Sequence, residues 1–260
     1  MDDNNFKKNY SMQTLHRAIQ ILRAFSTENK MLSLTELHNK TGLSKSSLQR
    51  LLSTLVFEGI LQKNEETKKY QLGIELLFLG NLVEKNSSLL SIANPIMKSI
   101  SEEIGETVSL SVIEENRRKC IGTIQSKYEL QAKVFVGQES PLNAGASAKV
   151  LLAFLPEEDL VKYLREIELP KLTDNTITSK DELLDELSKI SDQGFAISYG
   201  ERLKGIIAIS APIFDPFNEI LASLTVVIPT ARFEEYKKQV LIDLIKNGAS
   251  TITQKIKTIN

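Results

Sequence analysis

Two short segments with helix-start signals stand on either side of the three-residue turn Thr41-Gly42-Leu43. Ser33 precedes the first segment and Glu36 follows three residues later, which is the spacing of a capping box. Ser44 begins the second segment, which ends near Gly59. Two helices joined by so short a turn must cross and share a core. The pattern therefore predicts a helix-turn-helix motif in this part of the chain.

The second of these helices has two different faces. Its apolar stripe, spaced for a core, consists of Leu48, Leu51, Leu52 and Leu55. The opposite face carries Ser46, Gln49, Arg50 and Ser53, and the helix start adds Ser44, Lys45 and Ser47. Hydroxyl, amide and guanidinium groups of this kind can hydrogen-bond to base edges in the major groove of DNA. On an isolated helix, however, the same face would be an ordinary solvated surface.

The residues that follow favour the first of these interpretations. Residues 60–63 and 68–72 have the composition of two short strands, and the polar turn 64–67 joins them. Lysines stand on both arms, at Lys63, Lys68 and Lys69. A hairpin directly after a helix-turn-helix forms the wing of a winged helix, whose lysines can contact phosphates beside the groove. With a further helix pattern at 12–25, we expect a winged-helix DNA-binding domain over residues 10–73.

Charge and histidine are distributed unevenly along the chain. Residues 1–70 contain 11 lysine and arginine residues against 7 acidic ones, whereas the rest of the chain has 21 against 26. A polyanion partner is therefore expected for the N-terminal part. Both histidines, His16 and His38, also lie there, so the rest of the chain cannot form a Ser-His-Asp triad or a His-bearing metal site by itself. We expect no catalytic residue, no metal and no cofactor.

The single cysteine, Cys120, excludes an intramolecular disulfide and zinc sites built on cysteine clusters. Because no histidine is near it in sequence, Cys120 is expected to be a small strand residue rather than a nucleophile. The apolar runs fall short of the ~18 residues of a membrane span. The first ten residues include two Asp and no apolar segment of a secretory signal. We expect a cytoplasmic protein with no membrane partner.

After Gly73 the chain continues as an apolar helix and then as a mixed domain. The linker helix, predicted over residues 74–87, carries Leu76, Leu77, Leu79 and Leu82. This helix is too apolar to stand alone in water, so it packs against a second copy of the chain or against the chain's own C-terminal domain. The domain at 88–260 is predicted to contain strands at 107–113, 119–125, 133–136, 205–214 and 220–228, and helices at 89–104, 147–155, 179–193 and 233–257, with Pro95 kinking or breaking the first helix.

Three separated motifs stand in this second domain. They are SPLNAGASAKVLLAFLP at 140–156, TITSKDELLDELSKISDQGFAIS at 176–198 and GIIAISAPIFD at 205–215. In this order they resemble the IclR family of bacterial transcription regulators, and the resemblance extends over nearly the whole chain. Asn143 stands where the family often has histidine, Ala148 where it usually has glycine, and Ser198 near a position that is acidic in some members.

The resemblance implies an α+β fold with three parts: a winged helix-turn-helix domain, a linker helix, and a GAF-like α/β effector-binding domain with an antiparallel sheet. It also implies two partners, a small-molecule effector and a double-stranded DNA operator. The chain would bind this operator as a homodimer or homotetramer.

The small residues Gly145, Ala146 and Ser147 stand at a predicted helix start. Backbone N–H groups at such a place attract anions, and small side chains let a ligand approach them. Alternatively, Ser147 only caps the helix and the alanines permit tight packing. The family resemblance favours a ligand site and implies walls formed by Ser198, Ala208, Thr225 and Val227, with no Lys or Arg among them. The expected effector is a small organic anion, a carboxylate with an apolar or hydroxylated body.

These expectations describe a transcription regulator whose binding to its operator responds to a small molecule. Two other classes stay open: a GAF-like domain enzyme, and a DNA-bound partner-docking protein without an effector. The segment around Lys149 lacks a P-loop frame, and no G-x-G-x-x-G occurs, so a nucleotide site has no support. The acidic residues Glu182, Asp185 and Glu186 are expected to form a solvated helix face.

Overall fold

The structure is a computed structural model that describes residues 12–26 and 29–259. The chain divides into two compact units, with the boundary between Asn86 and Ser87. We call them the N-terminal unit and the C-terminal unit and describe each by itself. Among the described residues, no helix is long and apolar enough to cross a membrane.

The N-terminal unit is a winged helix. Helices α2 (Gln13–Arg23), α3 (Leu34–Thr41) and α4 (Lys45–Phe57) precede the antiparallel strands β1 (Leu61–Lys63) and β2 (Tyr70–Leu72). The predicted capping box is formed, because the Ser33 hydroxyl accepts from the Glu36 backbone N–H and the Glu36 carboxylate accepts from the Ser33 N–H. Gly42 ends α3 in the left-handed conformation, which glycine adopts without strain.

The core of this unit draws on helices α2, α3 and α4. Ile21 of α2, Leu37 of α3, and Leu48 and Leu52 of α4 are buried in one cluster. Leu51 and Leu55 pack against the same cluster and are partly buried. The apolar stripe predicted on α4 therefore faces the core, and the polar face of the helix is left on the surface.

A close backbone contact leads from the wing into α5 (Glu75–Asn86). The Gly73 N–H donates to the Ile60 carbonyl at 2.8 Å, and a Cβ at residue 73 would lie only 1.9 Å from the Gly59 carbonyl oxygen. Only glycine fits at this turn. Along α5, the side chains of Leu77 and Val83 are 56% and 68% exposed. The helix that follows the wing thus carries uncovered apolar surface.

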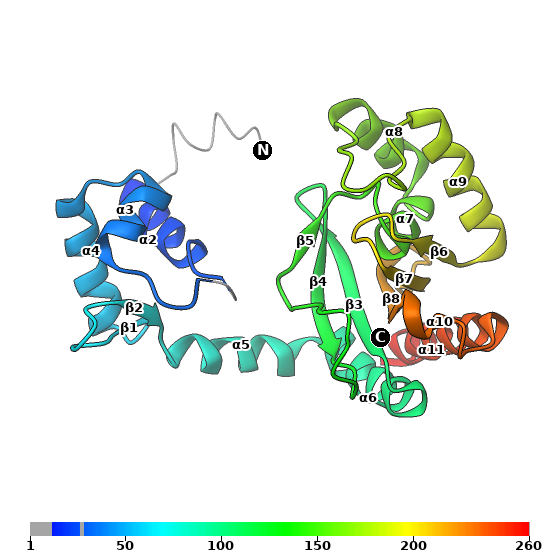
Figure 1. Ribbon diagram of the computed structural model, residues 1–260, viewed down its shortest axis with the longest axis horizontal. Helices are drawn as coiled ribbons and strands as arrows, with labels where there is room; N and C mark the ends of the chain where they lie inside the picture. The colour runs from blue at the N-terminus through cyan, green and yellow to red at the C-terminus, as the bar shows by residue number, and fades with distance from the viewer. Residues whose placement is uncertain (1–11, 27–28, 260) are drawn as a thin grey trace. The chain divides into compact units, whose positions relative to one another are not determined.

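The C-terminal unit is built on a six-stranded antiparallel sheet with the order β5-β4-β3-β8-β7-β6 (Figure 1). The strands are β3 (Thr107–Glu114), β4 (Arg117–Ile124), β5 (Glu139–Ser140), β6 (Ala196–Tyr199), β7 (Ile206–Phe214) and β8 (Ile220–Pro229). The helices are α6 (Ser88–Ile104), α7 (Ala146–Ala153), α8 (Glu157–Glu166), α9 (Lys180–Gln193), α10 (Thr230–Phe233) and α11 (Lys238–Ile259). The combination of this sheet with the N-terminal winged helix confirms the predicted α+β fold.

The two faces of the sheet bury different kinds of side chain. One face packs apolar residues of β3, β7 and β8 against α6 and α11. Because strand residues alternate between faces, the residues in between point to the other side, where α7 lies. Buried hydroxyls gather on that second face, from Ser109, Ser111, Ser198, Ser210, Ser223 and Thr225. A hydroxyl-rich sheet face under a helix is an unusual core and points to a polar site there.

One of the predicted strands was wrong. Residues 133–136 form no strand; β5 takes the place beside β4 instead. Val134 is buried in a small cluster with Cys120 and Ala132, whereas its neighbours Lys133 and Phe135 are exposed. Of the kink and the break predicted as alternatives at Pro95, the break does not occur, since α6 continues through this residue and buries apolar residues on both sides.

The helices differ from the prediction at two further places. Helix α8 was not predicted, although Pro156 and the acidic residues 157–159 that follow are a helix-start signal. At the C-terminus, the single predicted helix is divided into α10 and α11.

Candidate functional site

The polar face predicted on α4 is exposed in the structure. The exposed members are Ser44, Lys45, Ser46, Gln49, Arg50 and Ser53, whereas Ser47 is half-buried. Ser44 is the N-cap and its hydroxyl accepts from the Ser47 N–H at 3.3 Å. Ser53 donates its hydroxyl to the Gln49 carbonyl at 2.9 Å. Gln49 and Arg50 therefore remain as the two long side chains free to reach outward from the middle of this face.

The wing lysines are less free than the sequence suggested. Lys63 and Lys68 both contact the Glu65 carboxylate, at 3.5 and 3.0 Å, and Lys69 lies 3.8 Å from the Glu36 carboxylate. Lys45 and Arg50 have no ion pair among the described residues. The unpaired positive charge of this surface thus lies on α4 and, because Lys63 and Lys68 share one carboxylate, in part on the wing.

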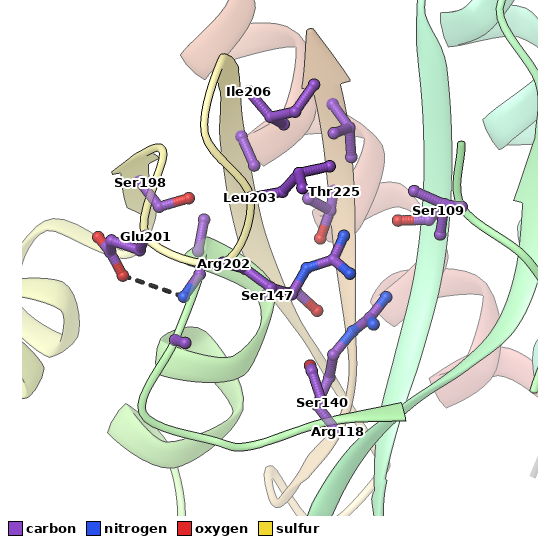
Figure 2. A pocket seen from close by; sticks show the side chains of 16 residues that line it. Ser109, Arg118, Ser140, Ser147, Ser198, Glu201, Arg202, Leu203, Ile206 and Thr225 are labelled. Atoms are coloured by element: carbon purple, nitrogen blue, oxygen red, sulfur yellow. Dashed lines mark hydrogen bonds between the residues drawn. The ribbon is translucent and has the colours of Figure 1, made fainter. Parts of the chain in front are cut away.

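The C-terminal unit contains a pocket on the hydroxyl-rich face of the sheet (Figure 2). All seven residues predicted for the ligand site line it: Gly145, Ala146, Ser147, Ser198, Ala208, Thr225 and Val227. The strand register explains this, because Ser198, Ala208 and Val227 stand side by side on β6, β7 and β8. The cavity volume is about 40 Å³, and ~10–15 Å³ measured in this way is enough to hold one water molecule.

At the start of α7, a carboxylate of the protein itself already accepts a backbone hydrogen bond. The N-cap is Gly145, in a conformation with φ 95°, and its N–H donates to Glu201 Oε2 at 3.0 Å. Lys149 Nζ donates to Glu201 Oε1 and to Glu186 Oε1, both at 2.7 Å, and is only 1% exposed. The Gly145 N–H is therefore not free for a ligand. The solvated face predicted for residues 182–186 was wrong at Glu186, which pairs with this buried lysine.

The hydroxyls predicted for the pocket are largely engaged within the fold. Ser147 is the second residue of α7 and shares a hydrogen bond of 2.8 Å with Ser223, so it does not cap the helix. Thr225 shares a 2.8 Å hydrogen bond with Ser210. These pairs tie α7 and β7 to β8, and they fix the shape of the pocket.

Two arginines that the sequence did not suggest also line the pocket. Arg118, at the start of β4, is 4% exposed; its Nε donates to the Ser111 hydroxyl at 3.0 Å, and its Nη1 has no hydrogen-bond partner among the described residues. Arg202 comes from the loop between β6 and β7. Burial, and then the charge of Arg202, lower the pKa of Arg118 to about 10. Burial also lowers the pKa of Arg202.

The expected absence of Lys and Arg from the pocket wall was therefore wrong. Residues 114–118 were predicted to be a turn, which hid the inward direction of Arg118 on β4. Residues 200–205 have no periodic pattern, so nothing in the sequence indicated where Arg202 points. The adjacent pair Arg117-Arg118 is the one signal available, since a strand sends neighbouring side chains to opposite faces: Arg117 is exposed and Arg118 is buried.

Other candidate residues have structural roles. Cys120 is fully buried, and its thiol donates to the Gly122 carbonyl at 3.3 Å. Burial raises the pKa of this thiol, as expected for a strand residue rather than a nucleophile. Asn143, one of the departures from the family pattern, donates its amide to the Pro170 and Ile177 carbonyls. Among the described residues, no group of His, Cys, Asp and Glu could hold a metal ion.

Comparison with protein families assigns both units. Residues 14–65 match the model of the IclR helix-turn-helix domain, and residues 82–254 match that of the bacterial transcriptional regulator IclR C-terminal domain. The chain belongs to the IclR family. The fold and the resemblance predicted from the sequence are thereby confirmed. IclR proteins are transcription regulators and not enzymes, so the enzyme alternative is not retained.

Individual relatives agree with this assignment. The chain is 31% identical to the HTH-type transcriptional regulator KipR of Bacillus subtilis, over 94% of this chain and 97% of that protein. The crystal structure of Thermotoga maritima IclR is 29% identical, with a TM-score of 0.79, and the match covers 95% of this chain and all of the other. An IclR homologue from Microbacterium hydrocarbonoxydans, solved with 4-hydroxybenzoate, is 20% identical with a TM-score of 0.83 over 95% of this chain and 100% of that one, which shows the shared fold.

Proposed function

We propose that this IclR-family protein is a regulator whose binding to a double-stranded DNA operator is modulated by a small organic anion. The operator is contacted by the exposed face of α4 and by the wing. The anion, a small carboxylate, is bound in the pocket beneath α7. The observation that carries the proposal is the buried guanidinium of Arg118, which faces this pocket with Nη1 unpaired.

An unpaired buried cation is costly for a protein, because it loses water and gains no counter-charge. Arg118 has no carboxylate partner among the described residues, and Glu201, the acidic residue of the wall, is already bonded to Lys149 and Gly145. A carboxylate ligand would supply the missing acceptor, with charge-assisted hydrogen bonds to the guanidinium. The homologue that binds 4-hydroxybenzoate supports the choice of a carboxylate, since the same fold accommodates one there.

The DNA part of the proposal rests on the chemistry of one face. Gln49 and Arg50 are the long exposed side chains at the middle of α4, and an amide and a guanidinium are suited to adenine and guanine edges. Lys45 lies one turn earlier at the helix start and is free to contact a phosphate. Helix α4 stands in the position of the recognition helix of a helix-turn-helix.

Two measurements on the full chain test the proposal together. The affinity for a duplex selected in vitro from a random library is measured with and without each member of a panel of small carboxylic acids, and the melting temperature is recorded with the same panel. At least one acid should raise the melting temperature and change the DNA affinity by fivefold or more, in the usual range of ~1–3 kcal/mol of coupling. The matched neutral amides are the controls. A panel in which no acid has either effect would support the partner-docking alternative instead.

We also propose that the chain acts as a homodimer or homotetramer, held together in part by α5. Exposed apolar side chains on this helix include Leu77, Phe78, Leu79, Leu82 and Val83, and a surface of this kind calls for a partner. One winged helix offers little contact area for tight specific binding, so two copies on two half-sites are expected.

Replacement of Leu77 and Leu79 by charged residues should therefore reduce the oligomer size in light scattering and abolish DNase footprints at the same time. The same substitution at Leu184, which is 42% exposed on α9, is the control and should change neither. Unchanged oligomer size in the α5 variant would mean that this surface is covered within the subunit.

A further inference from the structure

The charges on the pocket wall are unequal, and the imbalance limits the class of effector. Arg118 and Arg202 contribute two guanidinium groups, which point into the same part of the pocket (Figure 2). The charge of Arg202 is one of the causes that lower the pKa of Arg118, so the two groups are near enough to repel each other. Neither has an ion pair among the described residues. Like charges held together in a partly buried site repel each other, and an anion bound between them offsets that cost.

The carboxylate on the same wall does not compensate the arginines. Both oxygens of Glu201 are engaged, Oε2 with the Gly145 N–H and Oε1 with Lys149. Figure 2 shows this carboxylate turned toward the start of α7 and away from the two guanidinium groups. Lys149 is also paired with Glu186, so Glu201 belongs to a closed network beside the pocket. Within the part of the chain that the structure describes, the two arginines are left without a counter-charge.

Two polar atoms of the pocket wall have no hydrogen-bond partner among the described residues. Arg118 Nη1 and Ser140 Oγ are buried and have no hydrogen-bond partner among the described residues, and both residues line the pocket. Buried polar atoms are rarely left without partners unless a water or a ligand serves them. The pocket thus has two unpaired positive charges, one of them with an unsatisfied Nη1 donor, and one further unsatisfied group, the Ser140 hydroxyl.

We propose that the effector brings two negative charges to this pocket, as a short dicarboxylate or a phosphate monoester, and that Arg118 and Arg202 bind them together. The inference rests on the proposed function, in which this pocket holds the effector. A monocarboxylate can neutralise one guanidinium and leaves the other unpaired. A dianion neutralises both and offers oxygens enough for Ser140 as well. The small free volume favours a short molecule.

Matched pairs of ligands that differ only in charge provide the test, by calorimetry on the full chain. Dicarboxylates of three to six carbons are compared with their half-amides, and glycerol 3-phosphate is compared with its methyl phosphodiester. At least one dianion should bind tenfold or more tightly than its monoanionic counterpart, about 1.4 kcal/mol. The pair that shows the larger ratio decides between a dicarboxylate and a phosphate monoester.

Substitutions test whether the arginines cause this ratio of dianion to monoanion affinity. Arg202→Gln should reduce the ratio below threefold and leave the monoanion affinity within about threefold, and Arg202→Lys should restore part of the ratio. Arg117→Gln and Lys204→Gln remove one positive charge each from exposed residues paired with Glu139 and Asp174. These controls should keep the wild-type ratio, because neither residue lines the pocket.

The possible results separate this inference from the proposed function. Monoanions that bind wild-type protein as tightly as their dianions would overturn the dianion inference and leave the small-carboxylate proposal standing. A dianion preference that survives Arg202→Gln would also overturn it, since residues other than Arg202 would then recognise the second negative charge of the ligand. If no anion of either charge binds, both proposals fail.

Discussion

The two units hold unpaired arginines in opposite surroundings. Arg50 lies on the exposed face of α4, whereas Arg118 is only 4% exposed at the pocket wall of the C-terminal unit. Water solvates an exposed guanidinium well, so Arg50 costs the folded protein little when DNA is absent. A buried guanidinium has given up that water, so Arg118 should destabilise the protein, and the proposed anion should reverse this cost. The exposed face of α4 should therefore tolerate substitution without loss of stability, whereas at the pocket the stability of the protein should depend on ligand binding.

The largest effect is expected from a substitution of Lys149, the buried lysine beside the pocket. Lys149→Met removes the cation shared by Glu186 and Glu201 and leaves the Glu201 carboxylate buried without its partner. Breaking a buried ion pair in this way destabilises proteins by about 3–5 kcal/mol. We expect a loss of this size in the free energy of unfolding, measured by urea denaturation followed by circular dichroism.

Lys189→Met, at an exposed position on α9, is the matched control and should be nearly neutral. The double variant Lys149→Met/Glu201→Gln should recover part of the stability, because it removes the stranded charge. A loss below about 1 kcal/mol in the single variant would show that the network contributes little.

The second test fills the pocket. Ala146→Leu and Ala208→Phe place new side chains into a free space of about 40 Å³. Overpacking of this kind costs typically ~1–3 kcal/mol, and here the ligand's own space is lost as well. We expect the ligand-induced change in DNA affinity to disappear in both variants, while DNA binding without ligand stays at the wild-type level. Fluorescence anisotropy with the selected duplex measures both, and a variant that still responds would place the ligand elsewhere.

The sequence predicted those parts of the molecule that depend on local patterns. The capping box at Ser33, the apolar stripe of α4 and the hairpin of the wing follow from spacing within a few residues, and the structure has all of them. The seven pocket residues were predicted because the family resemblance supplied the long-range pairing of β6, β7 and β8, which alternation alone does not fix.

The parts that the sequence missed depend on contacts between distant segments. Arg118 enters the pocket only because β4 lies beside β3, and Arg202 only because a loop without periodicity turns inward. Glu201 reaches the start of α7 across 56 residues of sequence, and Lys149 is paired with residues 37 and 52 positions away. No pattern within one element shows where an ion pair of this kind will close, so the pocket's charge could not be predicted.

Substitutions on the exposed face of α4 provide a third test. Their expected effect is smaller and concerns DNA binding alone. Gln49→Ala and Arg50→Ala should each weaken binding to the selected duplex by roughly 1–3 kcal/mol and relax the preference at particular base pairs. Both side chains are exposed, so the free energy of unfolding should not change by more than about 0.5 kcal/mol. Gln254→Ala, at an exposed position on α11 of the C-terminal unit, is the control. A double variant that keeps full sequence discrimination would rule out α4 as the reading helix.

The smallest effects are expected at the wing, where the ion pairs compete with DNA. Lys68→Ala and Lys69→Ala should weaken binding to selected and random duplexes alike, and each should reduce the salt dependence by at most about one unit. Lys45→Ala should reduce it by more than either, because Lys45 has no acidic partner among the described residues, whereas Lys68 must first leave Glu65. Removal of the acidic partner should have the opposite effect. Glu65→Gln frees both Lys63 and Lys68, so it should strengthen binding to both duplexes and steepen the salt dependence; weaker binding would mean that Glu65 holds the wing in its binding conformation.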